Sequence, residues 1–206
     1  MNIKDIYKKR SADTKKYDCG MVIVIGGSEL YSGSPALSAL SALRSGADMA
    51  KIIAPQRAAD IAASFSPTLI TFPLQGKCLS LEHLPEINSL TRSAEIVSRG
   101  NVCVVIGGGA GRSKETKETI REYLKEVTIP VVIDADAIYA LEEEKIDFTD
   151  KKFLFTPHLY EFLTLTGRDI REVSDKEKEE AVKEEAEKLS SVILLKGGTD
   201  FISDGK

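Results

Sequence analysis

Short apolar runs rich in β-branched residues recur along this chain, and segments with helical spacing separate them. The segment after the first run, for example, places Leu37, Leu40 and Leu43 three residues apart. Near-continuous apolar strands that alternate with helices are typical of a parallel sheet covered on both faces. We therefore expect an α/β fold, a doubly wound and mainly parallel sheet with helices on both faces. The expected strands are 22–25, 49–53, 69–72, 102–106, 131–133, 153–155 and 192–195.

The length and charge of the chain limit the class of protein. The 206 residues favour a single α/β domain over 1–206, and the formal net charge of −4 gives no support to a nucleic-acid or membrane-surface partner. The three cysteines show no C-x-x-C spacing, so we expect neither a disulfide framework nor a zinc site. Free cysteines are typical of a reducing compartment, so we expect a cytoplasmic location. Residues 1–20 are polar and basic, and we expect an arm or leader there. No run approaches the roughly 20 apolar residues of a membrane helix.

Polar or glycine-rich segments directly follow five of the predicted strands. Ligands of open α/β sheets bind beyond the carboxyl ends of the strands. We therefore expect these segments to meet at one edge of the sheet and to form the functional site. The segments are Gly26-Gly27, Gly107-Gly108-Gly109, Asp134-Ala135-Asp136, Thr156-Pro157-His158 and Lys196-Gly197-Gly198.

The first glycine segment opens a loop that runs to Pro35. It contains neither a Walker A loop nor the G-x-G-x-x-G spacing of a dinucleotide fold. Ser34 is suited to cap a helix and Pro35 to be its first residue, so a helix is predicted to begin there with its first N–H groups directed into the crevice. A tight turn followed by a close-packed helix explains the same residues, and that alternative stays open.

The second glycine segment is denser than a turn requires. Four glycines fall within positions 107–111, which favours close approach of the backbone to a ligand. Ser113 is predicted to cap the helix that begins near Lys114.

Two carboxylates end a buried strand. Asp134 and Asp136 are two positions apart, so they would share one side of an extended backbone, where such a pair can hold Mg²⁺ through waters near a phosphate. A cap of the following helix explains Asp136 equally well. Asp134 is therefore the better candidate metal ligand.

His158 and Lys196 are the remaining candidates at this edge. His158 would start a helix with Thr156 as its cap and Pro157 as its first residue, a setting that favours contact with a ligand although a lone histidine is more often structural. Lys196 follows four apolar residues, where it can neutralise a phosphate; a simple hairpin would explain only the glycines after it. His83 has no such setting, and no serine lies in G-x-S-x-G, so a nucleophile-elbow hydrolase is excluded.

Five segments together resemble, in order and in spacing, the ADP/ATP-dependent NAD(P)H-hydrate dehydratases of the ribokinase-like superfamily. The segments are 22–48, 104–113, 131–138, 154–162 and 193–206. The resemblance implies that ADP or ATP drives dehydration of the S-form of hydrated NADH or NADPH, with release of AMP or ADP and phosphate. In the family's route the hydroxyl of the hydrate is phosphorylated and phosphate is then eliminated. The resemblance also implies a homo-oligomer, commonly a tetramer. Mg²⁺ is the further expected cofactor, on the grounds given for Asp134.

The same resemblance assigns residues to two ligands. The opening loop would contact the hydrated dinucleotide and not the phosphoryl donor. The implied substrate-binding residues are Ser34, Gly109, Gly111 and His158. The implied nucleotide-binding residues are Lys196, Gly197, Gly198, Thr199 and Asp200.

The sequence departs from the family pattern at several positions. Ser34 replaces an alanine, Gly108 and Ala110 replace Pro and Leu in Gly-Pro-Gly-Leu-Gly, and Leu159-Tyr160 replaces Ala-Gly or Pro-Gly, which places bulk near the pocket. The family's Gly-Thr-Gly-Asp segment, with its anion hole and general-base aspartate, does not occur up to Lys206, and neither does the family's epimerase domain. We therefore assign no catalytic residue, expect the C-terminal part of the fold to be missing, and expect weak or no turnover by residues 1–206 alone.

Two other functions stay open. A ribokinase-like small-molecule kinase, acting on a vitamin precursor or a sugar, would share the nucleotide site and stop after phosphoryl transfer. A non-catalytic nucleotide-binding protein would be consistent with the unassigned base. The sequence does not distinguish ADP from ATP, or NADH hydrate from NADPH hydrate.

Overall fold

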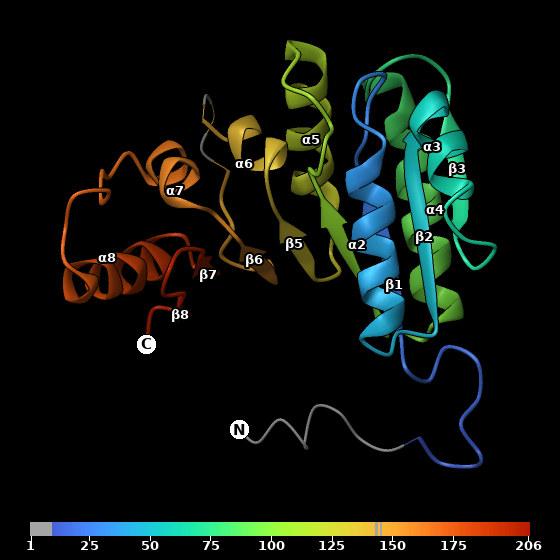
Figure 1. The fold of residues 1–206 in the computed structure, drawn as a ribbon, viewed down its shortest axis with the longest axis horizontal. Coiled ribbons are helices and arrows are strands. Elements are labelled where there is room, and N and C mark those ends of the chain that lie inside the picture. Colours follow the sequence, from blue (N-terminus) through green and yellow to red (C-terminus); the bar gives the residue numbers. More distant parts are fainter. Residues whose placement is uncertain (1–9, 143, 145) are drawn as a thin grey trace.

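The sheet is the frame of the molecule. The computed structural model describes residues 10–142, 144 and 146–206, which include one sheet of eight strands in the order β3-β2-β1-β4-β5-β6-β7-β8 (Figure 1). The strands are β1 (Met21–Ile25), β2 (Met49–Pro55), β3 (Ile70–Leu74), β4 (Val102–Ile106), β5 (Val131–Ile133), β6 (Phe153–Phe155), β7 (Val192–Leu195) and β8 (Phe201–Ser203). Strands β1 to β7 are parallel, and β8 forms an antiparallel hairpin with β7. The mainly parallel α/β sheet predicted from the sequence is confirmed, with strand ends shifted by two residues or fewer.

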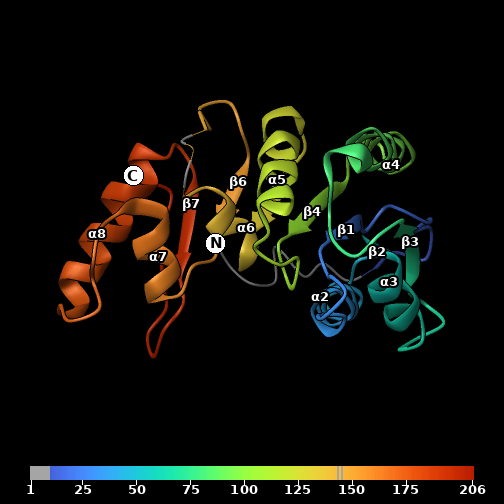
Figure 2. The same ribbon diagram turned by 90° about the horizontal axis from the view of Figure 1, so that it is seen from above.

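Helices lie on both faces of this sheet. They are α2 (Gly33–Arg44), α3 (Gln56–Ala63), α4 (Leu84–Val97), α5 (Lys114–Glu126), α6 (Asp136–Ala140), α7 (Leu159–Thr166) and α8 (Asp175–Lys188), with a single 3₁₀ turn, η1, at Leu81–His83. Figure 2 shows α2 and α3 on one face of the sheet and α4 and α5 on the other. Within the described residues, no helix has the length and apolar character needed to cross a membrane.

Strand alternation divides the core between the two faces. In β1, Ile23 and Ile25 belong to the large core on the α4 and α5 side, whereas Val24 belongs to the smaller core under α2 and α3. The smaller core is built largely from alanines, so these two helices lie close to the sheet. The buried helix alanines are Ala36, Ala39, Ala58, Ala59 and Ala62.

Coverage on the α2 face is incomplete. The described helices on that face, α2 and α3, pack against β1, β2 and β3. On the strands beyond, Val132, Leu154 and Val192 are only half-buried, while their sequence neighbours on the other face are fully buried. Helices thus lie on both faces as predicted, but the described residues leave β5 to β7 open on one side.

The segment before β1 contacts the amino edge of the sheet. Arg10 forms an ion pair of 3.0 Å with Asp48, and the Asn101 side chain donates a hydrogen bond to the carbonyl of Asp18. Residues 1–9 of the predicted N-terminal arm lie outside the described residues.

Candidate functional site

The two glycine loops are in direct backbone contact at the carboxyl edge of β1 and β4. The N–H of Gly27 donates to the carbonyl of Gly108 at 2.9 Å. A Cβ atom added to Gly26 would lie 2.5 Å from the oxygen of Gly108, and one added to Gly107, whose φ is +118°, would lie 2.0 Å from the carbonyl oxygen of Asp134. The three segments after β1, β4 and β5 therefore meet so closely that only glycine fits at the two junctions.

Ser34 lies beside the second glycine loop. A Cβ atom added to Gly108 would be 3.2 Å from the Cβ of Ser34, and one added to Gly109 would be 2.8 Å from the Cβ of Tyr31. The predicted cap is wrong, because α2 begins at Gly33 and the cap position falls on Ser32, which makes no side-chain cap bond. Ser34 is instead an exposed residue of the first helical turn, next to the loop that contains Gly109 and Gly111.

Asp136 binds the second glycine loop. Its carboxylate accepts from the N–H of Gly111 at 2.9 Å and from Nε of Arg112 at 2.7 Å. The Arg112 guanidinium also lies 3.4 Å from the centroid of the Tyr139 ring, and the hydrogen bond that Arg112 donates to Asp136 raises the pKa of Arg112. Gly111 and its neighbours are thereby held in one conformation.

The two carboxylates after β5 do not act as a pair. Ala135 between them has φ 50° and ψ −123°, so the backbone is not extended and the shared side predicted for Asp134 and Asp136 is wrong. The alternative, a cap by Asp136, is also wrong, because α6 begins at Asp136 itself and its carboxylate bonds outside the helix. Ser113, in contrast, caps α5 as predicted and accepts from the N–H of Thr116 at 3.2 Å.

Asp134 connects the middle of the edge to β7. Its Oδ1 accepts from Oγ1 of Thr156 at 2.8 Å and from Nζ of Lys196 at 2.7 Å. Lys196 and Asp134 retain side-chain exposures of 41% and 35%, so the ion pair is accessible to a ligand.

The donor set does not fit a Mg²⁺ site made of protein side chains. Mg²⁺ needs near-octahedral oxygen ligands, and one or two carboxylates supply them together with phosphates. Here Asp134 already accepts from Lys196, and no cluster of three His, Cys, Asp or Glu side chains occurs within the described residues. The assignment of Asp134 as a metal ligand stays a prediction that this geometry does not favour.

His158 is the cap of α7. The helix begins at Leu159, not at Pro157, and Nδ1 of His158 accepts from the N–H groups of Tyr160 and Glu161 at 3.1 and 3.2 Å. Glu161 completes the motif, because its Oε2 accepts from the N–H of His158 at 2.9 Å. The predicted cap by Thr156 is therefore wrong, and since Nδ1 accepts hydrogen bonds the neutral ring carries its proton on Nε2. The ring edge remains available to a ligand because the side chain is 48% exposed.

Lys196 lines two neighbouring hollows. One, of 240 Å³, is formed with the turn Gly197, Gly198 and Thr199 and with Lys178 of α8. The other, of 610 Å³, is formed with His158, Tyr160 and Arg171. Asp200 stabilises the turn of the first hollow by accepting from the N–H of Gly197 at 2.9 Å. Four of the five residues predicted to bind the nucleotide, Lys196 to Thr199, thus line one hollow, and His158 lines the next.

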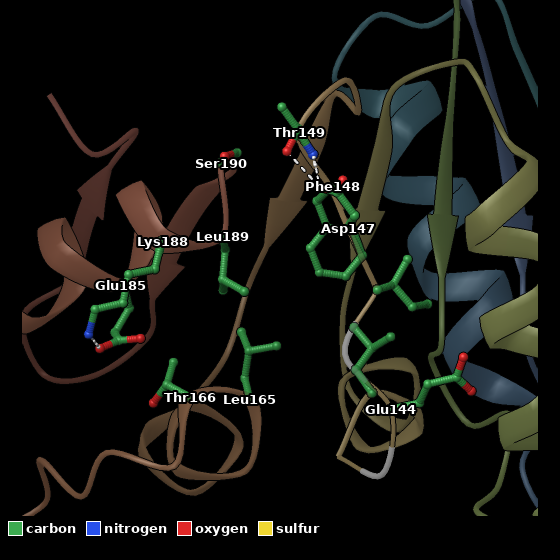
Figure 3. Close-up of a pocket in the computed structure, with 12 residues that line it drawn as sticks. Glu144, Asp147, Phe148, Thr149, Leu165, Thr166, Glu185, Lys188, Leu189 and Ser190 are labelled. Carbon is green, nitrogen blue, oxygen red and sulfur yellow. Dashed lines mark hydrogen bonds and ion pairs between the residues drawn. The ribbon is translucent and has the colours of Figure 1, made fainter.

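Figure 3 shows a further hollow of 390 Å³. It is lined by the last residues of α7, such as Leu165, by Lys188 and Leu189 at the end of α8, and by the segment around Phe148. Thr149 and Ser190, which come just before β6 and β7, also line it, so the hollow lies toward the amino edge of the sheet. None of the residues predicted for substrate or nucleotide binding lines this hollow.

Comparisons with known proteins identify the family. A family model described as NAD(P)H-hydrate dehydratase matches residues 22–206. The chain belongs to this family. It is 42% identical over 198 residues to the bifunctional NAD(P)H-hydrate repair enzyme of Pyrobaculum aerophilum, covering 95% of this chain and 37% of the relative. It is 32% identical over 197 residues to the ATP-dependent (S)-NAD(P)H-hydrate dehydratase of Phaeosphaeria nodorum, covering 92% of this chain and 60% of the relative. The chain thus spans between 37% and 60% of the length of these two relatives.

Solved structures share the fold of this dehydratase-family chain. A ribokinase-like superfamily protein from Enterococcus faecalis aligns with a TM-score of 0.75 at 22% identity, covering 94% of this chain and 63% of that one. The ADP/ATP-dependent NAD(P)H-hydrate dehydratase from Bacillus subtilis, co-crystallised with ATP and Mg²⁺, aligns with a TM-score of 0.72 at 22% identity, covering 96% of this chain and 65% of that one. The predicted family and the ribokinase-like fold are both confirmed.

Sequence reasoning missed several contacts of this family member. Thr156 binds Asp134, Arg112 binds Asp136, and Arg171 lines the hollow beside His158. Only Thr156 carried a signal, since it directly follows a strand. Arg171 follows His158 by more than a helix length and belongs to no motif, so only the folded chain places it at the site.

Proposed function

We propose that this chain takes part in the repair of hydrated NADH or NADPH, in which ADP or ATP drives dehydration of the S-form to the working cofactor. One observation supports this most directly. The segments after β1, β4, β5, β6 and β7 form a continuous chain of contacts, from the Gly27–Gly108 hydrogen bond to the Asp134–Lys196 ion pair. In a member of this family, that arrangement offers adjoining places for a dinucleotide and a phosphoryl donor.

The two ligands would occupy different parts of the edge. We infer that the donor lies against the turn Gly197, Gly198, Thr199 and Asp200, with Lys196 directed at its phosphates. Hydrated dinucleotide would contact Ser34, the loop that contains Gly109 and Gly111, and His158. Because one sheet holds all of these segments, we further infer that residues 1–206 act as a single domain. A homo-oligomer, a tetramer by family resemblance, and a cytoplasmic location stay predictions.

The reaction divides into two steps. In the first, the hydroxyl oxygen of the hydrate attacks the terminal phosphorus of ADP or ATP and forms a P–O bond. The bond from that phosphorus to the bridging oxygen breaks, AMP or ADP leaves with the electron pair, and the hydroxyl proton passes to a base. In the second, the C–O bond breaks, its electron pair leaves with phosphate, and loss of a proton from the ring restores the double bond. Phosphate leaves far more readily than hydroxide, which is the chemical reason for the nucleotide.

The side chains of this chain contribute charge and position. Lys196 neutralises charge on the transferring phosphoryl group, and Asp134 together with Thr156 fixes the direction of its ammonium group. The glycine loops contribute N–H groups and close backbone approach, which hold the hydroxyl in line with phosphorus. The general base is not assigned to any described residue, and Mg²⁺ would be bound chiefly through the nucleotide phosphates.

Turnover of the hydrate tests this proposal. The purified chain is incubated with S-NADH hydrate and either ADP or ATP, and recovery of the near-ultraviolet absorbance of NADH is followed together with phosphate release. The proposal expects both signals, equal in amount and dependent on nucleotide, at a low rate because no described residue is assigned as the general base. Lys196→Met is expected to lower the rate by about a hundredfold or more, because it removes the charge that faces the phosphates.

Other outcomes would contradict the proposal. Nucleotide consumption with a stable phosphorylated product and no NADH would indicate a small-molecule kinase. Tight nucleotide binding with no effect of the hydrate would indicate a non-catalytic nucleotide-binding protein.

A further inference from the structure

Tyr160 is a large aromatic residue exposed at the functional edge. It is the second residue of α7, two positions after the capping His158, and it is 60% exposed. Exposed single aromatic residues are common on soluble proteins, so exposure alone indicates nothing. Tyr160, however, lines the 610 Å³ hollow that also contains Lys196.

Two planar neighbours hold the Tyr160 ring. The guanidinium of Arg171 lies 4.7 Å from the ring centroid, and the His158 ring lies 6.3 Å away at 84°. Arg171 is itself bound by Asp169, with Nε donating to Oδ1 at 2.8 Å. The hydrogen bonds from Arg171 lower the pKa of Asp169 to about 2, so the Asp169 carboxylate stays ionised at all ordinary pH values. The ring is therefore oriented before any ligand arrives, which reduces the entropy cost of binding.

The walls of the hollow differ in chemistry. One wall is the aromatic ring of Tyr160 with its guanidinium neighbour, and the other is the ammonium group of Lys196. A planar π system joined to phosphates matches both walls, because bases stack on aromatic side chains and phosphates bind cations. In hydrated NADH the nicotinamide ring has gained a tetrahedral carbon that bears the hydroxyl, so adenine is the flatter of its two bases.

We propose that Tyr160, held by Arg171 and His158, is a stacking platform for an adenine ring. The ligand class is an adenine nucleotide whose phosphates lie toward Lys196. This inference rests on the proposed function for the two ligands that can supply the adenine, the hydrated dinucleotide and the phosphoryl donor. The platform is a specificity element of this chain, since the tyrosine occupies a position where the family pattern has glycine.

Binding titrations of the intact chain separate the two sources of adenine. Calorimetry is carried out with ADP, with NADH and with nicotinamide mononucleotide, which carries no adenine, on the wild type and on Tyr160→Ala and Tyr160→Phe. Tyr160→Ala is expected to lower the affinity for either ADP or NADH by about 5- to 100-fold, the usual effect of removing one stacking partner. Tyr160→Phe keeps the ring and is expected to bind as the wild type, and nicotinamide mononucleotide is expected to bind all three proteins equally.

A matched control is available on the other side of the molecule. Phe65 follows the end of α3, which runs away from the functional edge, and it is 57% exposed. Phe65→Ala removes an aromatic ring of similar exposure and is expected to leave all three affinities unchanged. The ligand that loses affinity in Tyr160→Ala identifies whether ADP or the dinucleotide supplies the adenine.

Two results would overturn the platform. Tyr160→Ala that binds both ADP and NADH as the wild type does would show that the ring stacks on neither. Equal weakening of all three probes would show that the substitution disturbs the loop. The platform and the proposed function can fail separately. Selective loss of affinity for an adenine-containing ligand in Tyr160→Ala tests the platform, and turnover of the hydrate by the wild type tests the proposed function.

Discussion

Substitution of His158 separates a structural role from a ligand contact at one residue. Nδ1 of His158 accepts from two N–H groups in the first turn of α7, at 3.1 and 3.2 Å. His158→Ala leaves both donors without this acceptor. His158→Asn supplies a side-chain oxygen that can accept in the same position, since asparagine is among the best capping residues. The pair of variants therefore differs mainly in the cap, while both lack the imidazole.

The cost of losing the cap follows from the geometry. Removal of a side-chain cap costs about 0.5–2 kcal/mol. The reciprocal bond, from the N–H of His158 to Glu161 at 2.9 Å, does not depend on the imidazole and remains. We therefore expect a loss of about 1 kcal/mol for His158→Ala, which corresponds to about 2–4 °C in Tm for a domain of this size. His158→Asn is expected to remain within about 0.5 kcal/mol of the wild type.

Urea unfolding followed by far-ultraviolet circular dichroism measures the stability of both variants. A lower midpoint with an unchanged slope indicates lost stability without a change in the unfolded state. Titration with S-NADH hydrate then tests the predicted substrate contact, for which both variants should weaken binding equally. His158→Ala as stable as the wild type, or His158→Asn as unstable as His158→Ala, would refute the capping argument.

Substitutions at Asp136, Gly107 and Asp134 test the contacts at the carboxyl edge of the sheet. Asp136→Ala removes the acceptor that holds the second glycine loop and should raise the KM for hydrate about tenfold. Asp136→Asn retains an acceptor and should raise the KM less. Unchanged kinetics in Asp136→Ala would contradict the role of Asp136 in holding the loop. Gly107→Ala places a Cβ 2.0 Å from the carbonyl oxygen of Asp134 and should lower the free energy of unfolding by about 3 kcal/mol or more, measured by urea unfolding. Gly33→Ala is the control, because its Cβ meets no atom within 4 Å and the substitution should be neutral or stabilising. Asp134→Asn should tighten ADP binding about twofold to fivefold in calorimetry, because Lys196 loses a competing anion; tenfold weaker binding would contradict this.

The meeting of the five segments was predictable from the sequence. It requires only that the strands be parallel, because then the residues after each strand share one edge. Apolar runs such as 102–106 and 131–133 carry that information without any knowledge of their partners. The antiparallel β7–β8 hairpin was also predictable, because Gly197 and Gly198 separate two apolar runs.

The start of α7 was not predictable, because strand pairing continues past β6. The carbonyl of Pro157 accepts from the N–H of Lys196 at 2.8 Å, and His158 pairs with Lys196 in a parallel bridge. The hydroxyl of Thr156 is used by Asp134 and cannot cap. These long-range contacts delay the helix by two residues and transfer the cap to His158.

The hydrogen-bond partners of Asp136 could not be predicted, because they depend on the backbone conformation of Ala135. A spacing of two residues predicts a shared side only if the residue between is extended, and Ala135 has a positive φ that only tertiary contacts can impose. The close junction at Gly107 leaves little room for an extended path there. Sequence spacing thus selected two residues that do make contacts at this edge, but it predicted the wrong geometry for them.

The two hollows at the edge meet at Lys196, and the proposed function would bring the donor and the substrate together there. The ion pair with Asp134 is about two-fifths exposed, and such pairs contribute at most about 1 kcal/mol. A phosphate with more than one negative charge can therefore draw the ammonium group away from Asp134 at small cost, while Thr156 still satisfies the carboxylate. Asp134 then holds Lys196 in place before the nucleotide binds and does not compete strongly once it has bound. A lysine held this way serves phosphoryl transfer better than one fixed by a buried pair, because a buried partner would oppose its movement onto the phosphate.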